Sequence, residues 1–390
     1  MTTRTVTPGA IAKITSGGTP DRENPAYWGG TVPWVKTTLV QNCEIGLDDI
    51  DEKITEAGLK RSSAKLIPAG SILMAMVGQG KTRGQVAVLT TDAAINQNCA
   101  AIILNEEAHC RYVYQQLLFR YKAIRNASNS SGQQNLNAGL IRELQVPLPR
   151  LDEQAKIAEI LDAWDAAIQT TEQLIAAKER HYSHELSSVI SRRQHSPAHV
   201  GAFAEEVSAR NRGGNEARVL SVTNSRGFAL PEDQFERRVA SADLSNYKIV
   251  RRGQYAYNPS RINIGSIARL DDWDDGVLSP MYVVFRLDDA KVDSDYFLHW
   301  LNSHEARQRI KNSAQGSVRE TVSFSEFAAI TIPLPDRSTQ AAIARYLNAL
   351  RAELKLLDQT IAALETQKRG LMQKLLTGQW RPLISQEATA

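Results

Sequence analysis

The sequence predicts an α+β protein in which two pseudo-symmetric α+β segments are separated by two long helices that form an antiparallel coiled coil. Three observations lead to this fold class: a gapless internal repeat, a heptad pattern in both copies of the repeat, and a globular segment of similar size before each copy. The chain has 390 residues, 42% of them hydrophobic and 23% charged, which suits two or three folded domains.

Residues 146–179 and 332–365 repeat each other at a constant offset of 186 positions. They share 15 identical residues in 34 positions, where chance would give about two or three at typical residue frequencies. Both copies begin with a Pro-x-Pro sequence, which disfavours helix, and then continue as long helical patterns. The repeat therefore indicates a duplication.

The second copy carries the cleaner heptad seam, with apolar residues at alternating steps of three and four. Its predicted packing residues are Leu347, Leu350, Leu354, Leu357, Ile361 and Leu364. In the first copy the same register gives Leu161, Trp164, Ile168 and Ile175, with polar residues interrupting it. We expect the two seams to face each other in one intramolecular coil of helices about 60 Å long. The first copy ends in "RHYSHELSSVISRR" and the second in a leucine-rich tail, so the helices are expected to differ at that end.

The segments before the two helices match each other in plan. Residues 70–89 correspond to 253–270, and residues 112–149 correspond to 296–335. Each segment is predicted to hold several short strands, then a helix, a polar loop, and a short strand that leads into Pro-x-Pro. The predicted boundaries are 1–149 for the first α+β domain, 150–195 for the first helical spacer, 196–335 for the second domain and 336–380 for the second spacer.

The stretch "AMVGQGKT" (75–82) differs at one position from a phosphate-binding loop. Such a loop needs a helix after it, because the helix N-terminus and the loop amides hold the anion. The residues that follow, "RGQVAVLTT", alternate like a strand. We therefore interpret the stretch as a hairpin loop that presents Lys81 and Arg83, with Arg261 and Asn263 in the same role in the second domain.

Basic residues gather in matching sections of the two domains, although the formal net charge is only +3. Arginine and lysine bind phosphates, while arginine, asparagine and glutamine read base edges. Two equivalent patches in a duplicated chain suit a two-part DNA site, because half-site spacing mirrors protein geometry. The predicted DNA contacts are Lys60, Arg61, Lys81, Arg83, Gln133, Gln134, Arg251, Arg252, Arg261, Asn263 and Arg319.

Catalytic and metal-binding patterns are weak. His181-x-x-His184 and His195-x-x-x-His199 have no cysteine or carboxylate partners at ligand spacing, so no metal site is predicted. No nucleophile motif and no glycine-rich cofactor fingerprint is found, and we expect neither catalysis nor a cofactor on this chain. The three cysteines form no Cys-x-x-Cys pair, and no signal peptide or membrane-spanning run is recognised, which favours a cytoplasmic protein.

Over nearly its whole length the chain resembles the specificity (S) subunits of type I restriction-modification systems. The matching stretches are "SGGTPDRENPAYWGGTVPWV" (16–35), "VPLPRLDEQAKIAEILDAWDAAI" (146–168), "IPLP" followed by Gln340 and Ile343, and "KRGLMQKLLTG" (368–378). The resemblance implies two target-recognition domains held apart by a helical ruler, each of which reads one half of a bipartite DNA sequence.

The resemblance also implies the partners. Such a subunit has no catalysis of its own; it binds double-stranded DNA, two methyltransferase (M) subunits and restriction (R) subunits. The S-adenosylmethionine and ATP sites are then expected on those partner subunits. Two alternatives stay open: the specificity chain of a related, type IIB-like system, and an autonomous enzyme that binds nucleotide at the Gly-Lys-Thr loop.

Overall fold

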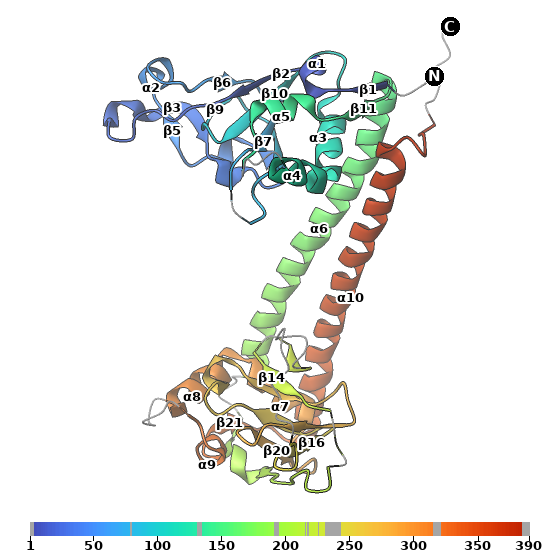
Figure 1. The fold of residues 1–390 in the computed structure, drawn as a ribbon. Helices are drawn as coiled ribbons and strands as arrows, with labels where there is room; N and C mark the ends of the chain where they lie inside the picture. The colour runs from blue at the N-terminus through green and yellow to red at the C-terminus, as the bar shows by residue number, and fades with distance from the viewer. Residues whose placement is uncertain are drawn as a thin grey trace. The chain divides into compact units, whose positions relative to one another are not determined.

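The computed structural model describes residues 4–78, 80–130, 135–190, 195–214, 216, 218–224, 226–230, 243–314 and 321–383. The chain divides into two compact units: unit 1 contains Met1–Thr171 and Thr360–Ala390, and unit 2 contains Glu172–Gln359. The two long helices, α6 (Leu151–Ile190) and α10 (Arg337–Leu376), each give one half to each unit (Figure 1). The predicted α+β fold class with two long helices is confirmed.

Unit 1 is built on two sheets. The larger has the order β2-β10-β7-β8-β4, with antiparallel pairs except for the parallel pair β4–β8. Its strands are β2 (Ala12–Ser16), β10 (Cys99–Leu104), β7 (Ile72–Ala75), β8 (Val86–Leu89) and β4 (Cys43–Ile45). The smaller has the order β5-β3-β9-β6, with strands β5 (Lys53–Ile54), β3 (Trp28–Val35), β9 (Ala93–Ile95) and β6 (Leu66–Ile67).

Helices cover both sheets of unit 1. They are α1 (Pro8–Ile11), α2 (Glu56–Lys60), α3 (Cys110–Phe119), α4 (Tyr121–Ser130) and α5 (Ala138–Glu143), with 3-10 turns η1 (Pro25–Tyr27), η2 (Thr37–Leu39) and η3 (Leu47–Asp49). Of these helices, α2 packs against β3 and β5 of the smaller sheet. Strands β7 and β8 are buried on both faces, because alternate residues enter two different cores. One core includes Tyr112 of α3, Leu161 of α6 and Leu376 of α10, so the half-helices of unit 1 are part of its interior.

Unit 2 contains a four-stranded antiparallel sheet in the order β13-β20-β17-β18. Its strands are β13 (Ala204–Glu206), β20 (Val283–Leu287), β17 (Tyr255–Tyr257) and β18 (Ile267–Arg269). Two further pairs are β14 (Ser221–Thr223) with β15 (Gly227–Ala229) and β16 (Lys248–Arg251) with β19 (Asp275–Leu278). The other elements are α7 (Ser294–Asn302), α8 (His304–Ala314), α9 (Phe324–Ala328), η4 (Val200–Ala202) and η6 (Ile262–Ile264).

The core of unit 2 is rich in aromatic rings. Tyr255 stacks on Phe285 with ring centroids 5.2 Å apart, and Phe297 meets Tyr255 edge-on at 5.3 Å. Offset stacking and edge contacts are the arrangements that aromatic quadrupoles favour. Leu186 of α6 and Leu347 of α10 belong to this core, so unit 2 also incorporates its half-helices.

Both units fasten the start of a long helix in the same way. A two-stranded ribbon precedes each helix: β1 (Arg4–Val6) with β11 (Val146–Leu148), and β12 (Pro197–His199) with β21 (Thr331–Pro333). A buried tyrosine hydroxyl donates to the first proline carbonyl of each Pro-x-Pro, from Tyr112 to Pro147 at 2.8 Å and from Tyr296 to Pro333 at 2.6 Å. The duplication therefore extends to individual hydrogen bonds.

A buried glutamine in the first turn of each helix repeats the same bonds. Gln154 accepts from the amide of His109 at 2.8 Å and donates to the carbonyl of Pro149 at 2.9 Å. Gln340 accepts from the amide of Asp293 at 2.7 Å and donates to the carbonyl of Pro335 at 2.8 Å. Each glutamine thereby satisfies backbone groups that would otherwise be buried without a partner.

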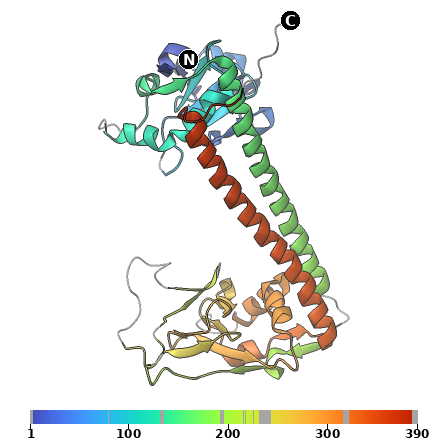
Figure 2. The ribbon, with the colours of Figure 1, turned by 90° about the vertical axis from the view of Figure 1, so that its right-hand side faces the viewer.

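The half-helices pair antiparallel within each unit, and both views show them side by side (Figure 1 and Figure 2). In unit 1, Asp165 of α6 forms an ion pair with Lys368 of α10. In unit 2, Lys178 of α6 lies 2.6 Å from the carboxylate of Glu353 of α10. Also within unit 2, the hydroxyl of Tyr346 of α10 donates to Glu185 of α6 at 3.1 Å, so partner numbers fall along α10 as they rise along α6, which is the mark of antiparallel pairing.

All ten predicted seam residues are buried or half-buried. Leu161 and Leu347 are fully buried. The other eight are half-buried: Trp164, Ile168, Ile175, Leu350, Leu354, Leu357, Ile361 and Leu364. The difference arises because the globular part of each unit covers Leu161 and Leu347. No helix in the described part of the chain is long and apolar enough to span a membrane.

Candidate nucleic-acid interface

The connection between β7 and β8 presents Lys81 in unit 1. The two strands pair antiparallel, which confirms the predicted strand–loop–strand arrangement of the "AMVGQGKT" stretch. The hydroxyl of Tyr121, at the start of α4, donates to the carbonyl of Lys81 at 2.5 Å. Arg125, one turn later, donates to the carbonyl of Arg83 at 3.3 Å and to the Tyr121 hydroxyl at 2.9 Å. These bonds hold the backbone of the loop, while the side chain of Lys81 stays exposed.

The connection between β17 and β18 takes the same place in unit 2. Its residue Arg261 is exposed and Asn263 is half-buried, on either side of the buried Ile262 of η6. Ile262 belongs to the same core as Ile310 of α8, and α8 packs against η6. Here the loop is fixed by apolar packing under a helix, whereas hydrogen bonds from a helix fix the loop of unit 1.

The two connections share backbone geometry. Each ends in a glycine at positive φ two residues before the next strand, Gly84 at 87° and Gly265 at 95°. In this left-handed region a side chain would be strained, so glycine is required. The match supports an equivalent role for the two loops.

A second polar segment lies against each connection. The amide of Leu136 donates to the carbonyl of Met76 at 3.0 Å, and the amide of Val322 donates to the carbonyl of Pro259 at 3.1 Å. The described ends of the predicted loops 130–137 and 314–323 are thus adjacent to the hairpin loops. The predicted contacts Gln133, Gln134 and Arg319 lie outside the described residues.

Lys60 and Arg61 occupy a different part of unit 1. They end α2, which packs against η1 and β3 instead of the β7–β8 connection. The ammonium group of Lys60 lies 4.0 Å from the carboxylate of Glu56 one turn earlier, and both side chains are exposed. Their predicted contact with DNA stays a prediction.

Arg251 and Arg252 are separated from Arg261 and Asn263. The first pair precedes β17 and the second pair follows it, so the two pairs lie at opposite ends of this strand. Arg252 also forms an ion pair with Asp274, with nitrogen and oxygen 2.9 Å apart. The four residues therefore do not form one patch around a single loop.

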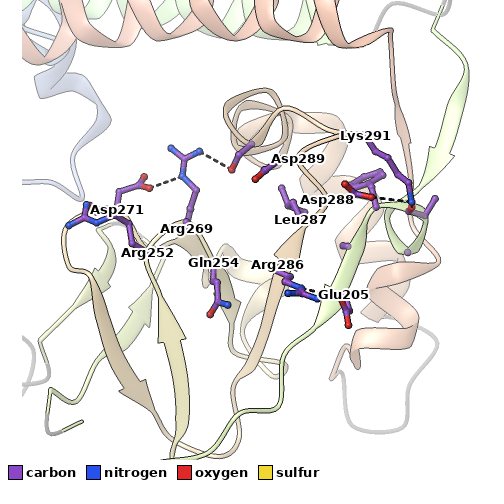
Figure 3. Close-up of a pocket in the computed structure, with 16 residues that line it drawn as sticks. Glu205, Arg252, Gln254, Arg269, Asp271, Arg286, Leu287, Asp288, Asp289 and Lys291 are labelled. Atoms are coloured by element: carbon purple, nitrogen blue, oxygen red, sulfur yellow. Dashed lines mark hydrogen bonds and ion pairs between the residues drawn. The ribbon is translucent and has the colours of Figure 1, made fainter. Parts of the chain in front are cut away.

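A cavity of about 1190 Å³ lies beside Arg252 at the end of the four-stranded sheet (Figure 3). Figure 3 shows Arg269 beside Asp271 and Arg286 beside Glu205, and both pairs are joined at 2.7 and 2.6 Å. Four basic and four acidic residues line the cavity, so its formal charge is zero: Arg252, Arg269, Arg286, Lys291, Glu205, Asp271, Asp288 and Asp289. Such a surface does not attract an anion over a cation.

The predicted contacts include neither Tyr121 nor Arg125, which hold the loop backbone. A tyrosine and an arginine four residues apart lie on the same helix face, and this spacing is the signal that could have indicated a shared contact. The positions whose carbonyls they bind, Lys81 and Arg83, carry no such signal, because any residue has a carbonyl.

The buried cysteine thiols are not activated as nucleophiles. Burial raises the pKa of the Cys99 and Cys110 thiols to about 11, so neither is a thiolate near neutral pH. Among the described residues, no group of three or more histidine, cysteine, aspartate or glutamate side chains is arranged to hold a metal ion.

Comparison with known proteins identifies a matching family model and related sequences. The family model described as "Type I restriction modification DNA specificity domain" matches residues 3–180 and 251–366. The type I restriction enzyme EcoR124I/EcoR124II specificity subunit of Escherichia coli is 31% identical over 163 residues, 40% of this chain. The type I restriction enzyme MjaIX specificity subunit of Methanocaldococcus jannaschii is 29% identical over 164 residues, 41% of this chain. The matched stretches span only 39% and 37% of those two relatives.

The fold is also similar to a solved structure. The crystal structure of a type I restriction-modification system S subunit from M. genitalium superposes with a TM-score of 0.60, covering 99% of this chain and 97% of the other. The two sequences are 15% identical, so this likeness concerns the fold alone.

Proposed function

Because the chain belongs to the type I restriction modification DNA specificity family, we propose that it is the sequence-recognition and scaffold subunit of such a complex. In this proposal, each unit reads one half of a bipartite site on double-stranded DNA. The β7–β8 and β17–β18 connections hold phosphates and contact bases, through Lys81 and Arg83 in unit 1 and Arg261 and Asn263 in unit 2.

One observation carries the proposal. In both units a strand–strand connection lies beside a second polar segment and presents an exposed basic side chain. The bonds Leu136–Met76 and Val322–Pro259 join equivalent segments, and the exposed cations are Lys81 and Arg261. Backbone contacts to phosphate position a reader and base contacts give specificity, so each unit has the parts for both tasks.

In the same proposal, the paired halves of α6 and α10 set the number of base pairs left unread and bind two methyltransferase subunits. The half-buried seam of residues 164–178 and 350–368 supports this role, because a two-helix coil leaves helix faces open to further helices. Restriction subunits would join the complex. S-adenosylmethionine and ATP would be bound by those partners, and this chain would be non-catalytic and work in the cytoplasm.

The test is to co-express the chain with its neighbouring methyltransferase chain and to map methylated adenines across the genome by single-molecule sequencing. The proposal expects a two-part motif with a fixed gap. A continuous motif would mean that the two units do not act as separate half-site readers. Absence of methylation together with failure of the chains to co-purify would remove the scaffold role as well.

A further inference from the structure

A small cationic cavity of about 290 Å³ lies in unit 2 between α6, the α7–α8 junction and α10. Polar side chains from four elements line it: Ser183 and Ser187 from α6, Asn302 from α7, His304 and Arg307 from α8, and Arg351 from α10. Among the residues that the structure describes, no aspartate or glutamate lines it. In this respect it is the opposite of the cavity in Figure 3, where basic and acidic residues balance.

Arg307 and Arg351 have no carboxylate within ion-pair distance in the described part of the chain. Nearby acids are already engaged. Glu305 lies 2.6 Å from the guanidinium of Arg309, on another face of α8, and Glu353 lies 2.6 Å from the ammonium of Lys178. The two guanidinium groups therefore face the cavity with their hydrogen-bond donors uncommitted.

The internal repeat identifies the residues of unit 1 that correspond to Tyr182 and Arg351 at this cavity. At the repeat offset of 186, Arg351 corresponds to Asp165 and Tyr182 corresponds to Lys368. In unit 1 these positions form the ion pair between Asp165 and Lys368, and Gln115 donates to Asp165 at 2.8 Å. Unit 1 thus supplies its own anion at this place, whereas unit 2 has an arginine there and no acid.

A chain of hydrogen bonds holds Tyr182, one of the residues that line the cavity. The ring of His299 bonds the hydroxyl of Tyr182 at 2.9 Å on one side and the side-chain oxygen of Asn348 at 2.9 Å on the other. Asn348 in turn donates to the carboxylate of Asp295 at 2.8 Å. Because Asn348 donates to Asp295, its oxygen accepts from the histidine, which leaves the other ring nitrogen to accept from Tyr182. These bonds orient the side chain of Tyr182 at the cavity.

We propose that this cavity binds a phosphate group. Planar guanidinium groups match the geometry of phosphate oxygens and bind them in a bidentate manner, and serine hydroxyls add neutral donors. Arg307 and Arg351 hold the oxyanion from two helices, with His304 at the first turn of α8 beside them. The phosphate comes either from the DNA backbone or from a free phosphate or nucleotide. Only the first source rests on the proposed DNA-recognition function.

Titration of the full chain with inorganic phosphate at low ionic strength, followed by calorimetry, tests the site. Arg307→Gln and Arg351→Gln are each expected to weaken phosphate binding by about tenfold or more, since each removes charge-assisted hydrogen bonds. Arg345→Gln is the matched control, because Arg345 is an exposed arginine of α10 outside the cavity lining and its loss should leave binding unchanged. If the unaltered chain does not bind phosphate, or if all three variants behave alike, the proposal is wrong.

A charge transplant from unit 1 gives an independent test. The double variant Tyr182→Lys, Arg351→Asp places the ion pair of unit 1 in unit 2. It is expected to keep the far-ultraviolet circular dichroism of the folded chain while phosphate binding is lost, and to unfold at a lower temperature because the bond from Tyr182 to His299 is removed. Phosphate binding that persists in a folded double variant would overturn the assignment, as would acetate competing as well as phosphate.

The source of the phosphate is decided with a duplex of arbitrary sequence. If the DNA backbone supplies it, Arg351→Gln weakens duplex binding and lowers the slope of log affinity against log salt by about one. If a free phosphate or nucleotide supplies it, duplex binding is unchanged while phosphate and ATP binding fall together. Bipartite adenine methylation is a separate readout, so failure of the phosphate site and failure of the proposed function are distinguishable.

Discussion

Units 1 and 2 share a backbone plan but hold their long helices with different polar chemistry. In unit 1 a charged network joins α3 to α6: Arg111 lies 2.6 Å from Glu44 and 2.9 Å from Asp162. In unit 2 the matching contact between α7 and α10 joins a carboxylate to an amide: Asn348 donates to Asp295 at 2.8 Å and also bonds the ring of His299 at 2.9 Å. The ribbons, the tyrosine bonds and the glutamine bonds recur, while these side-chain networks do not.

The difference separates two kinds of contact. A glutamine or tyrosine that bonds backbone carbonyls depends only on the shape of the chain, so both copies can keep it. A side-chain pair depends on both partners, and a pair of opposite charges can be exchanged for a carboxylate and an amide if both partners change together. We therefore expect equivalent variants of the first kind to act equally in the two units, and variants of the second kind to act in one unit only.

The largest effects are expected for the buried seam residues. Leu161→Ala and Leu347→Ala should each lower the free energy of unfolding of their own unit by about 2–5 kcal/mol, because each leaves a cavity in a core that is closed on all sides. Urea unfolding followed by hydrogen exchange in each unit measures the two values. Leu356→Ala, at a position 62% exposed, is the control with little effect. A large difference between the losses of unfolding free energy in Leu161→Ala and Leu347→Ala would show that the two seams are not equivalent.

The glutamine bonds should come next. Gln154→Leu and Gln340→Leu keep the approximate volume but leave buried amides and carbonyls without partners, which costs about 1–3 kcal/mol in each unit. Similar losses of unfolding free energy in the two units, in the same measurement, would support the view that bonds to the backbone act equally in both copies. An unaffected stability in one unit would show that water replaces the glutamine there.

The loop side chains are expected to act on one half-site each. Arg261→Ala should weaken binding by roughly tenfold to DNA in which the half-site of unit 2 is intact and the other is scrambled, and Lys81→Ala should do the same for the opposite hybrid. Fluorescence anisotropy with the two hybrid duplexes gives the affinities. Equal losses on both hybrids, or no loss on either, would contradict the assignment of Lys81 and Arg261.

The smallest effect concerns acid sensitivity, which should differ between the units. Burial lowers the pKa of His299 below its usual value, so the unfolded state binds a proton more readily than the folded one. Stability from this group is therefore present above the unfolded pKa of about 6.5 and is lost as pH falls through the folded pKa. Unit 2 should lose stability between pH 7 and 5 and His299→Gln should remove that loss, whereas Gln115 at the matching place in unit 1 does not titrate. A loss that is unchanged in His299→Gln would assign it to another group.

Much of the fold was accessible from the sequence, because periodicity reports it directly. The steps of three and four from Leu347 to Leu364 follow from a helix with one covered face, and the offset of 186 led from one helix to the other. Gln154 and Gln340 are identical residues at the repeat offset, but the sequence does not predict their bonding, because their partners are carbonyls and amides that any residue carries.

The candidate site was less accessible for the same reason. The sequence grouped Arg251 and Arg252 with Arg261, yet β17 is a three-residue strand that places them at its opposite ends. It also grouped basic residues without their acidic partners, whereas the β16–β19 register brings Asp274 to Arg252. Charge counted along a chain does not give charge in space, since strand pairing joins windows that the count keeps apart.

The half-helix composition of the units has a consequence for synthesis on the ribosome. Unit 2 is one continuous stretch, Glu172–Gln359, whereas the interior of unit 1 includes Leu375 and Leu376 of α10, and Gln116 donates to the Leu376 carbonyl at 2.9 Å. The chain emerges from its N-terminus. The N-terminal part of unit 1 is therefore translated first, but unit 1 is completed last. Its core lacks Leu375 and Leu376 until the final turns of α10 leave the exit tunnel.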